Sequence, residues 1–68
     1  MRLYEILGMF TTGSETIGCG FESKENAKLF LESLKEELKN EEYERFNELV
    51  YEHDPKDLLS LTIDTIEY

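Results

Sequence analysis

Hydrophobic and polar positions divide the chain into a β-rich start, a helical middle and a β-rich end. The segment Arg2–Phe10 (RLYEILGMF) is rich in aromatic and branched residues, which predicts a strand. Both faces of that strand are apolar, one carrying Leu3, Leu7 and Met9 and the other Tyr4, Ile6 and Phe10. We therefore expect a central strand, or a strand with one face covered by a partner.

A second strand follows a glycine-centred turn. Residues 11–15 (TTGSE) are typical of a turn, and residues 16–21 (TIGCGF) alternate apolar residues with glycines, so the pair predicts a β-hairpin. The alternation places Cys19 on the core side of its strand as a small buried hydrophobe. Gly18 and Gly20 leave one face of the strand bare, which favours close packing of a helix over a docking surface for a partner.

Two apolar sets at helical spacing fill the middle of the chain. The first is Ala27, Phe30, Leu31, Leu34 and Leu38, and the second is Tyr43, Phe46, Leu49, Val50 and His53. The second set lies about 100° from the first around a helix, so one straight helix would not direct both toward a single core. The spacing predicts two helices, about Lys24–Lys39 and Glu41–Glu52, after an N-cap at Ser23. Asn40, which tolerates the left-handed conformation, marks the bend.

The end of the chain returns to a β pattern. Pro55 stops the second helix, and residues 58–68 alternate apolar and polar side chains as a strand does. Ile66 and Tyr68 then fall on the opposite face from Leu61 and Ile63, which a bulge or a two-sided environment would explain.

These elements, in the order β-β-α-α-β, predict one α+β domain over residues 1–68. Its sheet is three-stranded and mainly antiparallel, with both helices on one face. The predicted core consists of Leu3, Leu7, Ile17, Phe30, Leu31, Leu34, Leu38, Phe46, Val50, Leu61 and Ile63.

Composition limits how so short a chain is stabilised and where it works. A core built from 68 residues is small, and one cysteine and one histidine supply neither an internal disulfide nor a Cys/His zinc site. Self-association would add buried surface, so we expect a homodimer. The chain shows no signal peptide and no run of about 18 apolar residues, which favours the cytoplasm of a bacterial or phage-infected cell and no membrane contact.

Catalytic chemistry lacks a recognisable pattern. His53 follows a helix, where a capping or half-buried role is more common than catalysis, and Cys19 sits in a strand without a base beside it. The run Glu52-His53-Asp54 indicates adventitious binding of a divalent ion rather than a dedicated metal site. We therefore expect a protein that is not an enzyme, with no catalytic residues, no cofactor and no metal.

Acidic residues concentrate in the second predicted helix. The net charge of −9 argues against direct contact with nucleic acid and is compatible with a basic protein partner. Five carboxylates at spacings of four, three, four and four form an outward stripe: Glu37, Glu41, Glu44, Glu48 and Glu52. Like charges at this spacing destabilise a helix, and only Arg45 offsets them. The stripe is the predicted partner-binding site, although a solvated helix face is an equally good explanation.

In size, charge and mixed α/β layout, the chain resembles small phage-encoded DNA mimics, such as inhibitors of uracil-DNA glycosylase, and anti-CRISPR proteins. The resemblance covers the chain as a type and assigns no residue roles. It implies an inhibitor whose carboxylates stand in for phosphates in the basic cleft of a nucleic-acid-binding protein. The alternative is a homodimeric structural or adaptor module of unknown target. It is supported by the two-sided apolar strand Arg2–Phe10, the bare face at Gly18 and Gly20, and the irregular C-terminal strand.

Overall fold

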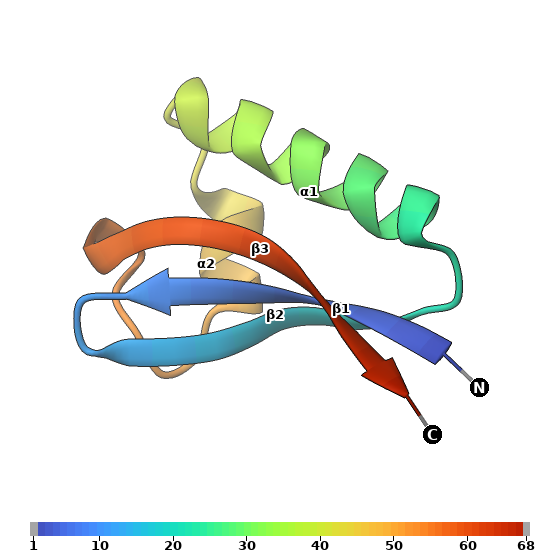
Figure 1. Ribbon diagram of the computed structural model, residues 1–68. Helices are drawn as coiled ribbons and strands as arrows, with labels where there is room; N and C mark the ends of the chain where they lie inside the picture. The colour runs from blue at the N-terminus through green and yellow to red at the C-terminus, as the bar shows by residue number, and fades with distance from the viewer. Residues whose placement is uncertain (1, 68) are drawn as a thin grey trace.

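The computed structural model describes residues 2–67 and forms a three-stranded antiparallel sheet with two helices. Its elements are β1 (Arg2–Phe10), β2 (Gly13–Phe21), α1 (Lys24–Lys39), α2 (Glu44–Leu49), the short 3-10 helix η1 (Pro55–Asp57) and β3 (Leu58–Glu67). The strand order is β2-β1-β3, so β1 is central, and the helices cover one face of the sheet (Figure 1). The predicted α+β class, element order and helix placement are confirmed.

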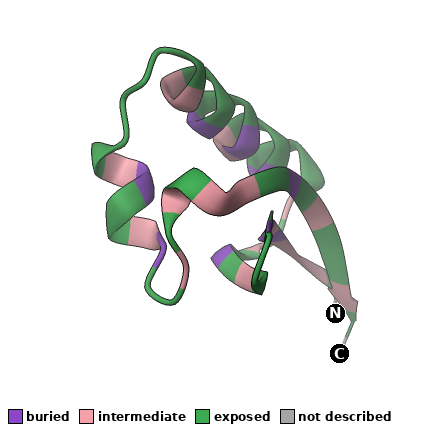
Figure 2. Cartoon of the chain, turned by 90° about the vertical axis from the view of Figure 1, so that its left-hand side faces the viewer, coloured by how far each residue is buried: buried purple, intermediate pink, exposed green. Residues whose placement is uncertain are grey.

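The core lies between the helices and the covered face of the sheet, where the buried positions in Figure 2 gather. Six predicted core residues are buried: Ile17, Leu31, Leu34, Phe46, Val50 and Leu61. Three others are partly buried and pack against that cluster: Phe30, Leu38 and Ile63. Helix α1 contacts all three strands, and Phe46 of α2 is fully buried, with its ring 6.5 Å from that of Phe10 on β1.

The predicted orientation of β1 is wrong. Ile6 and Phe10 face the core at 0% and 4% exposure, whereas Leu3 and Leu7 lie on the open face. Gly8 explains the error. It lies between Ile6 and Phe10 on the core face, so the sequence lacks the third apolar side chain that would have identified this face as buried. A Cβ at Gly8 would stand 2.5 Å from Cδ1 of Ile17, so the glycine is needed for close packing.

Strand β2 departs from regular alternation through two register shifts. Tyr4 pairs with Phe21, Ile6 with Gly18 and Leu7 with Thr16, so β2 carries extra residues opposite β1. Cys19 is exposed, and its predicted burial is wrong because the bulges change which face it occupies. Phe30 of α1 packs over Gly18, as a bare strand face allows.

The left-handed residue after α1 lies one position later than predicted. The N–H of Glu42 donates to the carbonyl of Glu37 at 2.8 Å, and that of Glu41 donates to Leu38 at 3.1 Å. This pair of bonds is the Schellman arrangement, in which the residue after the C-cap is left-handed. That residue is Glu41, with φ of 61°, while Asn40 keeps a negative φ of −88°.

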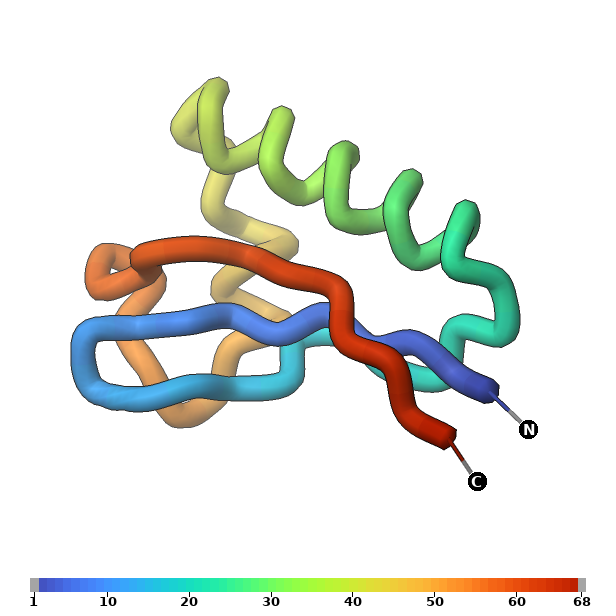
Figure 3. The backbone as a smooth tube through the Cα atoms, in the orientation of Figure 1, coloured from blue at the N-terminus to red at the C-terminus, as the bar shows by residue number. Residues whose placement is uncertain are grey.

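Helix α2 is shorter than the predicted Glu41–Glu52 at both ends. It begins only after the left-handed turn, and it ends where Val50 becomes extended, with φ of −104° and ψ of 122°. The next two backbone N–H groups donate to the carboxylate of Glu15 on β2 instead of continuing the helix. Figure 3 traces this segment, between α2 and η1, as it passes beside the hairpin of β1 and β2. A long-range contact therefore sets the C-terminal end of α2.

Strand β3 pairs with β1 without interruption from Glu67 back to Ser60, and its register shift lies at its start, beside Phe10. The bulge considered near the chain end is therefore absent as far as Glu67, and Tyr68 lies outside the described residues. Ile66 lies opposite Leu3 on the open face, which agrees with the two-sided environment. Within residues 2–67, no helix is long and apolar enough to cross a membrane.

Candidate partner-binding site

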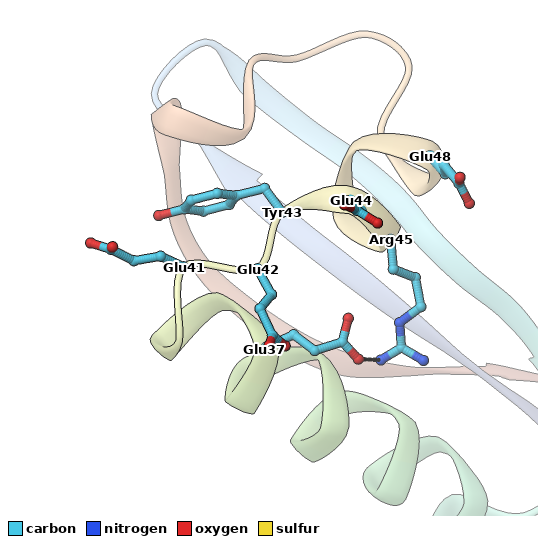
Figure 4. Close-up of a pocket in the computed structure, with 7 residues that line it drawn as sticks. All are labelled: Glu37, Glu41, Glu42, Tyr43, Glu44, Arg45 and Glu48. Atoms are coloured by element: carbon cyan, nitrogen blue, oxygen red, sulfur yellow. Dashed lines mark ion pairs between the residues drawn. The ribbon is translucent and has the colours of Figure 1, made fainter.

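An acidic hollow of about 630 Å³ lies between the end of α1 and helix α2 (Figure 4). We call it the acidic hollow; its lining residues are Glu37, Glu41, Glu42, Tyr43, Glu44, Arg45 and Glu48. The carboxylates come from three consecutive parts of the chain, which are the last turns of α1, the connecting turn and α2. They thus surround a concavity instead of following one straight helix.

The left-handed turn at Glu41 creates this arrangement. By ending α1 there, it brings Glu37 on α1 near the beginning of α2, which carries Glu44 and Glu48. The last two are four residues apart on one helix, where like charges destabilise by a few tenths of a kcal/mol. The repulsion between Glu44 and Glu48 therefore lowers the stability of α2.

Arg45 is the basic residue that lines the hollow. Its guanidinium pairs with Glu37 at 2.7 Å, donates to Oγ of Ser33 at 3.2 Å and lies 5.1 Å from the ring centroid of Phe30. Its Nε is buried with no hydrogen-bond partner among the described residues. Arg45 thus neutralises one carboxylate and anchors α2 to α1, while the other four carboxylates of the hollow remain exposed.

Four of the five predicted stripe residues line the hollow, and Glu52 does not. The continuous helical row expected from the spacing is absent, because α2 includes only Glu44 and Glu48 of the stripe. The spacing did not single out Glu42 and Tyr43, which the turn brings to the site, and it placed Arg45 off the stripe. Their roles depend on the positive φ at Glu41, where no glycine signals a left-handed residue.

Glu52 belongs to a different cluster, centred on Glu15 and His53. Oε1 of Glu15 lies 2.8 Å from Nδ1 of His53 and accepts from the N–H of Glu52 at 3.0 Å, while Oε2 accepts from the N–H of Tyr51 at 2.6 Å. The side chains of Glu15 and His53 are only 8% and 11% exposed. The His53 ring also stacks on Phe10 at 4.7 Å, so the half-buried role predicted for it is confirmed.

The environment of Glu15 favours its ionised form. Burial alone would raise the pKa of this carboxyl group, but the hydrogen bonds from His53 and from the N–H groups of Tyr51 and Glu52 outweigh that effect and lower the pKa below its ordinary value. Because an ionised carboxylate only accepts, Nδ1 of His53 carries the proton in this contact.

Glu15, Glu52 and His53 could together hold a metal ion, since their ligand atoms lie within 4.8 Å of one another. Both oxygens of Glu15 already accept hydrogen bonds from the segment after α2. A metal ion would have to displace the contact between Glu15 and His53. The cluster therefore acts as a connection between β2 and the segment that follows α2.

Comparisons of the chain with models of protein families, with curated proteins and with solved structures find no match. The geometry and charge of the acidic hollow are therefore the basis for the function proposed below.

Proposed function

We propose that this protein is a small non-enzymatic inhibitor that binds the basic cleft of a nucleic-acid-binding protein. Its carboxylates would occupy the positions of phosphates, within a bacterial or phage-infected cell. The observation that carries the proposal is that five glutamates line one open hollow, with Arg45 as the one cation among its lining residues.

The charges of the hollow suit recognition of a cationic surface. A concave surface lined by one sign of charge concentrates the field and accelerates association with an oppositely charged partner. Such binding is weakened by salt, because mobile ions screen exposed charges over about 8–10 Å at physiological ionic strength. The partner's lysine or arginine side chains would relieve the repulsion between Glu44 and Glu48.

The contributions of the individual carboxylates differ. Glu37 is partly exposed and already paired with Arg45, so it has less charge to offer a partner. Glu41, Glu42, Glu44 and Glu48 are exposed and form no ion pair within the described residues, so we place them at the centre of the contact. Glu52 would lie outside it.

The test is affinity capture with three baits. The first is the native protein, and the second has Glu41, Glu44 and Glu48 changed to glutamine, which preserves shape and removes charge. The matched control carries glutamine at Glu22, Glu25 and Glu32, which are exposed acids before and within the first two-thirds of α1 and do not line the acidic hollow. Proteins retained from a bacterial lysate would be eluted with rising NaCl and identified by mass spectrometry.

We expect the native and control baits to retain the same nucleic-acid-binding protein, and the hollow variant to lose it. An added DNA or RNA duplex should also displace that protein from the native bait. Equal retention by all three baits, or displacement by neither nucleic acid, would contradict the proposal.

The alternative, a homodimeric adaptor module, has its own support in the open face of the sheet. Leu3, Leu7 and Ile66 are only partly buried there, and none belongs to the core or packs against it. On the same face, Glu5 lies directly opposite Asp64, and like charges opposite each other destabilise a sheet. A dimer that stacks two such faces would bring Glu5 and Asp64 of both copies close together, and the four carboxylates would repel one another.

Sedimentation equilibrium distinguishes this alternative. A dimer formed through the open face should strengthen with salt, and the substitution Glu5→Gln should tighten it by relieving repulsion. A monomer at all salt concentrations, for the native protein and for Glu5→Gln, would exclude the homodimeric module.

A further inference from the structure

A second hollow adjoins the acidic hollow and differs from it in chemistry. It measures about 550 Å³, and its apolar lining comes from Leu38, Pro55 and Leu58. Asp54 and Lys56 also line it and carry opposite charges. We call it the apolar hollow; it has no excess of either charge.

Tyr43 lines both hollows. The residue is 45% exposed, and its ring stacks on no other aromatic ring within residues 2–67. Figure 4 shows the ring extending away from the carboxylates that point toward Arg45. As the N-cap of α2, Tyr43 makes no capping hydrogen bond through its side chain. The ring is thus available as a surface shared by a strongly negative concavity and an apolar one.

We propose that the two hollows bind one segment of the partner protein, which presents basic side chains to the acidic hollow and an apolar side chain to the apolar hollow. This inference rests on the proposed function and specifies the partner's chemistry. The basic residues pair with Glu41, Glu42 and Glu44, and one of them can lie over the Tyr43 ring, where a cation–π contact is favourable.

Charge and shape together exclude simpler occupants. A nucleic acid would be repelled by the acidic hollow. A polycation without apolar side chains would leave Leu38, Leu58 and the Tyr43 ring in water. A segment that combines both chemistries removes apolar surface from water and satisfies the carboxylates, which gives specificity beyond net charge.

Two labelled peptides test the inference by fluorescence anisotropy. Each contains eight lysines in twelve residues; the remaining four are serine in one peptide and leucine in the other. The native protein should bind the leucine peptide at least about fivefold more tightly than the serine peptide. This is the factor expected when part of one leucine side chain is buried.

Two variants test whether the preference for the leucine peptide arises at the apolar hollow. Tyr43→Ser removes the shared ring and leaves a good N-cap residue, and Asn47→Trp adds bulk at an exposed α2 position that lines the apolar hollow. Each should reduce the preference for leucine to less than about twofold. Asn47→Trp should leave binding of the serine peptide unchanged, whereas Tyr43→Ser should weaken both peptides through loss of the cation–π contact. Equal binding of the two peptides by the native protein, or a preference that survives both variants, would overturn the inference.

This outcome is separable from that of the capture experiment. If the serine and leucine peptides bind equally while the glutamine-sensitive target is still retained, the apolar hollow plays no part and the proposed function stands. If the leucine preference is present but no nucleic-acid-binding protein is captured, the surface binds basic-apolar segments of another class of protein.

Discussion

Two groups of glutamates in this protein have opposite environments. Glu15 is nearly buried, accepts hydrogen bonds from two backbone N–H groups and contacts His53. The glutamates of the acidic hollow are mostly exposed. Among the described residues, Glu37 alone of these glutamates forms an ion pair, with Arg45. A glutamate side chain is thus expected to stabilise the folded chain at position 15 and to destabilise it, through repulsion, in the acidic hollow.

The difference separates a carboxylate that contributes to stability from the carboxylates that we propose for recognition. A carboxylate that already accepts three hydrogen bonds from its own chain has little capacity left for a partner. Carboxylates gathered around a hollow at a cost in repulsion remain available to an external cation. Substitutions at the two groups should therefore change stability in opposite directions.

The largest effect is expected at Glu15. Glu15→Ala would leave the N–H groups of Tyr51 and Glu52 without their acceptor and His53 without its partner, so unfolding free energy should fall by about 2–4 kcal/mol. Urea denaturation at pH 7 measures this change. Glu48→Ala, at an exposed position of the hollow, is the control and should be neutral or slightly stabilising. Equal losses for both variants would remove the distinction between the two groups.

Acid should weaken the protein through the same residue. Because the pKa of Glu15 is lower in the folded chain than its ordinary value of 4.5, its stabilising effect is complete above that pH and is lost as pH falls through the folded value. Urea unfolding from pH 7 to pH 3 should show this loss in the native protein and not in Glu15→Gln. Relief of repulsion among the exposed acids affects both proteins, so the difference between their profiles isolates Glu15.

The acidic hollow should respond in the opposite sense. Changing Glu41, Glu44 and Glu48 together to glutamine should raise unfolding free energy by about 0.5–1 kcal/mol at low salt, because like charges are removed. Thermal unfolding in 10 mM and in 1 M NaCl measures the gain, which should nearly vanish at high salt. The matched change of Glu22, Glu25 and Glu32 should give no gain, because Glu25 lies in the first turn of α1 and Glu32 has Lys28 and Lys35 at helical spacing. A loss of stability would show that the hollow carboxylates support the fold.

Helix α1 and the β1–β2 hairpin could be predicted because the sequence features that specify them are local. The apolar spacing in Lys24–Lys39 and the serine before it determine α1, whose bounds are confirmed. The turn residues around Gly13 likewise predicted the hairpin of β1 and β2, but the turn is only Thr11–Thr12 and β2 begins at Gly13, three residues before the predicted strand. These features depend on residues that are near one another in the sequence.

The errors arise where tertiary contacts decide. Gly8 hides the core face of β1 because its missing side chain makes room for Ile17. Contact with Glu15 ends α2, and Glu15 is more than 30 residues away from the N–H groups that it binds, with separations of 36 and 37. Within the site, the spacing of acidic residues identified four hollow carboxylates, but their concave arrangement depends on the left-handed turn at Glu41.

That turn provides the smallest and sharpest test. A residue other than glycine in the left-handed region is strained, so Glu41→Gly should stabilise the protein by about 0.5 kcal/mol after the greater flexibility of unfolded glycine is subtracted. Glu41→Gln removes the same charge without relieving the backbone, and the comparison of the two in urea denaturation separates strain from repulsion. Asn40→Gly, at a negative φ, should give no gain. If Glu41→Gly is no more stable than Glu41→Gln, the left-handed turn carries no strain, and the position of the hollow follows from the contacts of Arg45 instead.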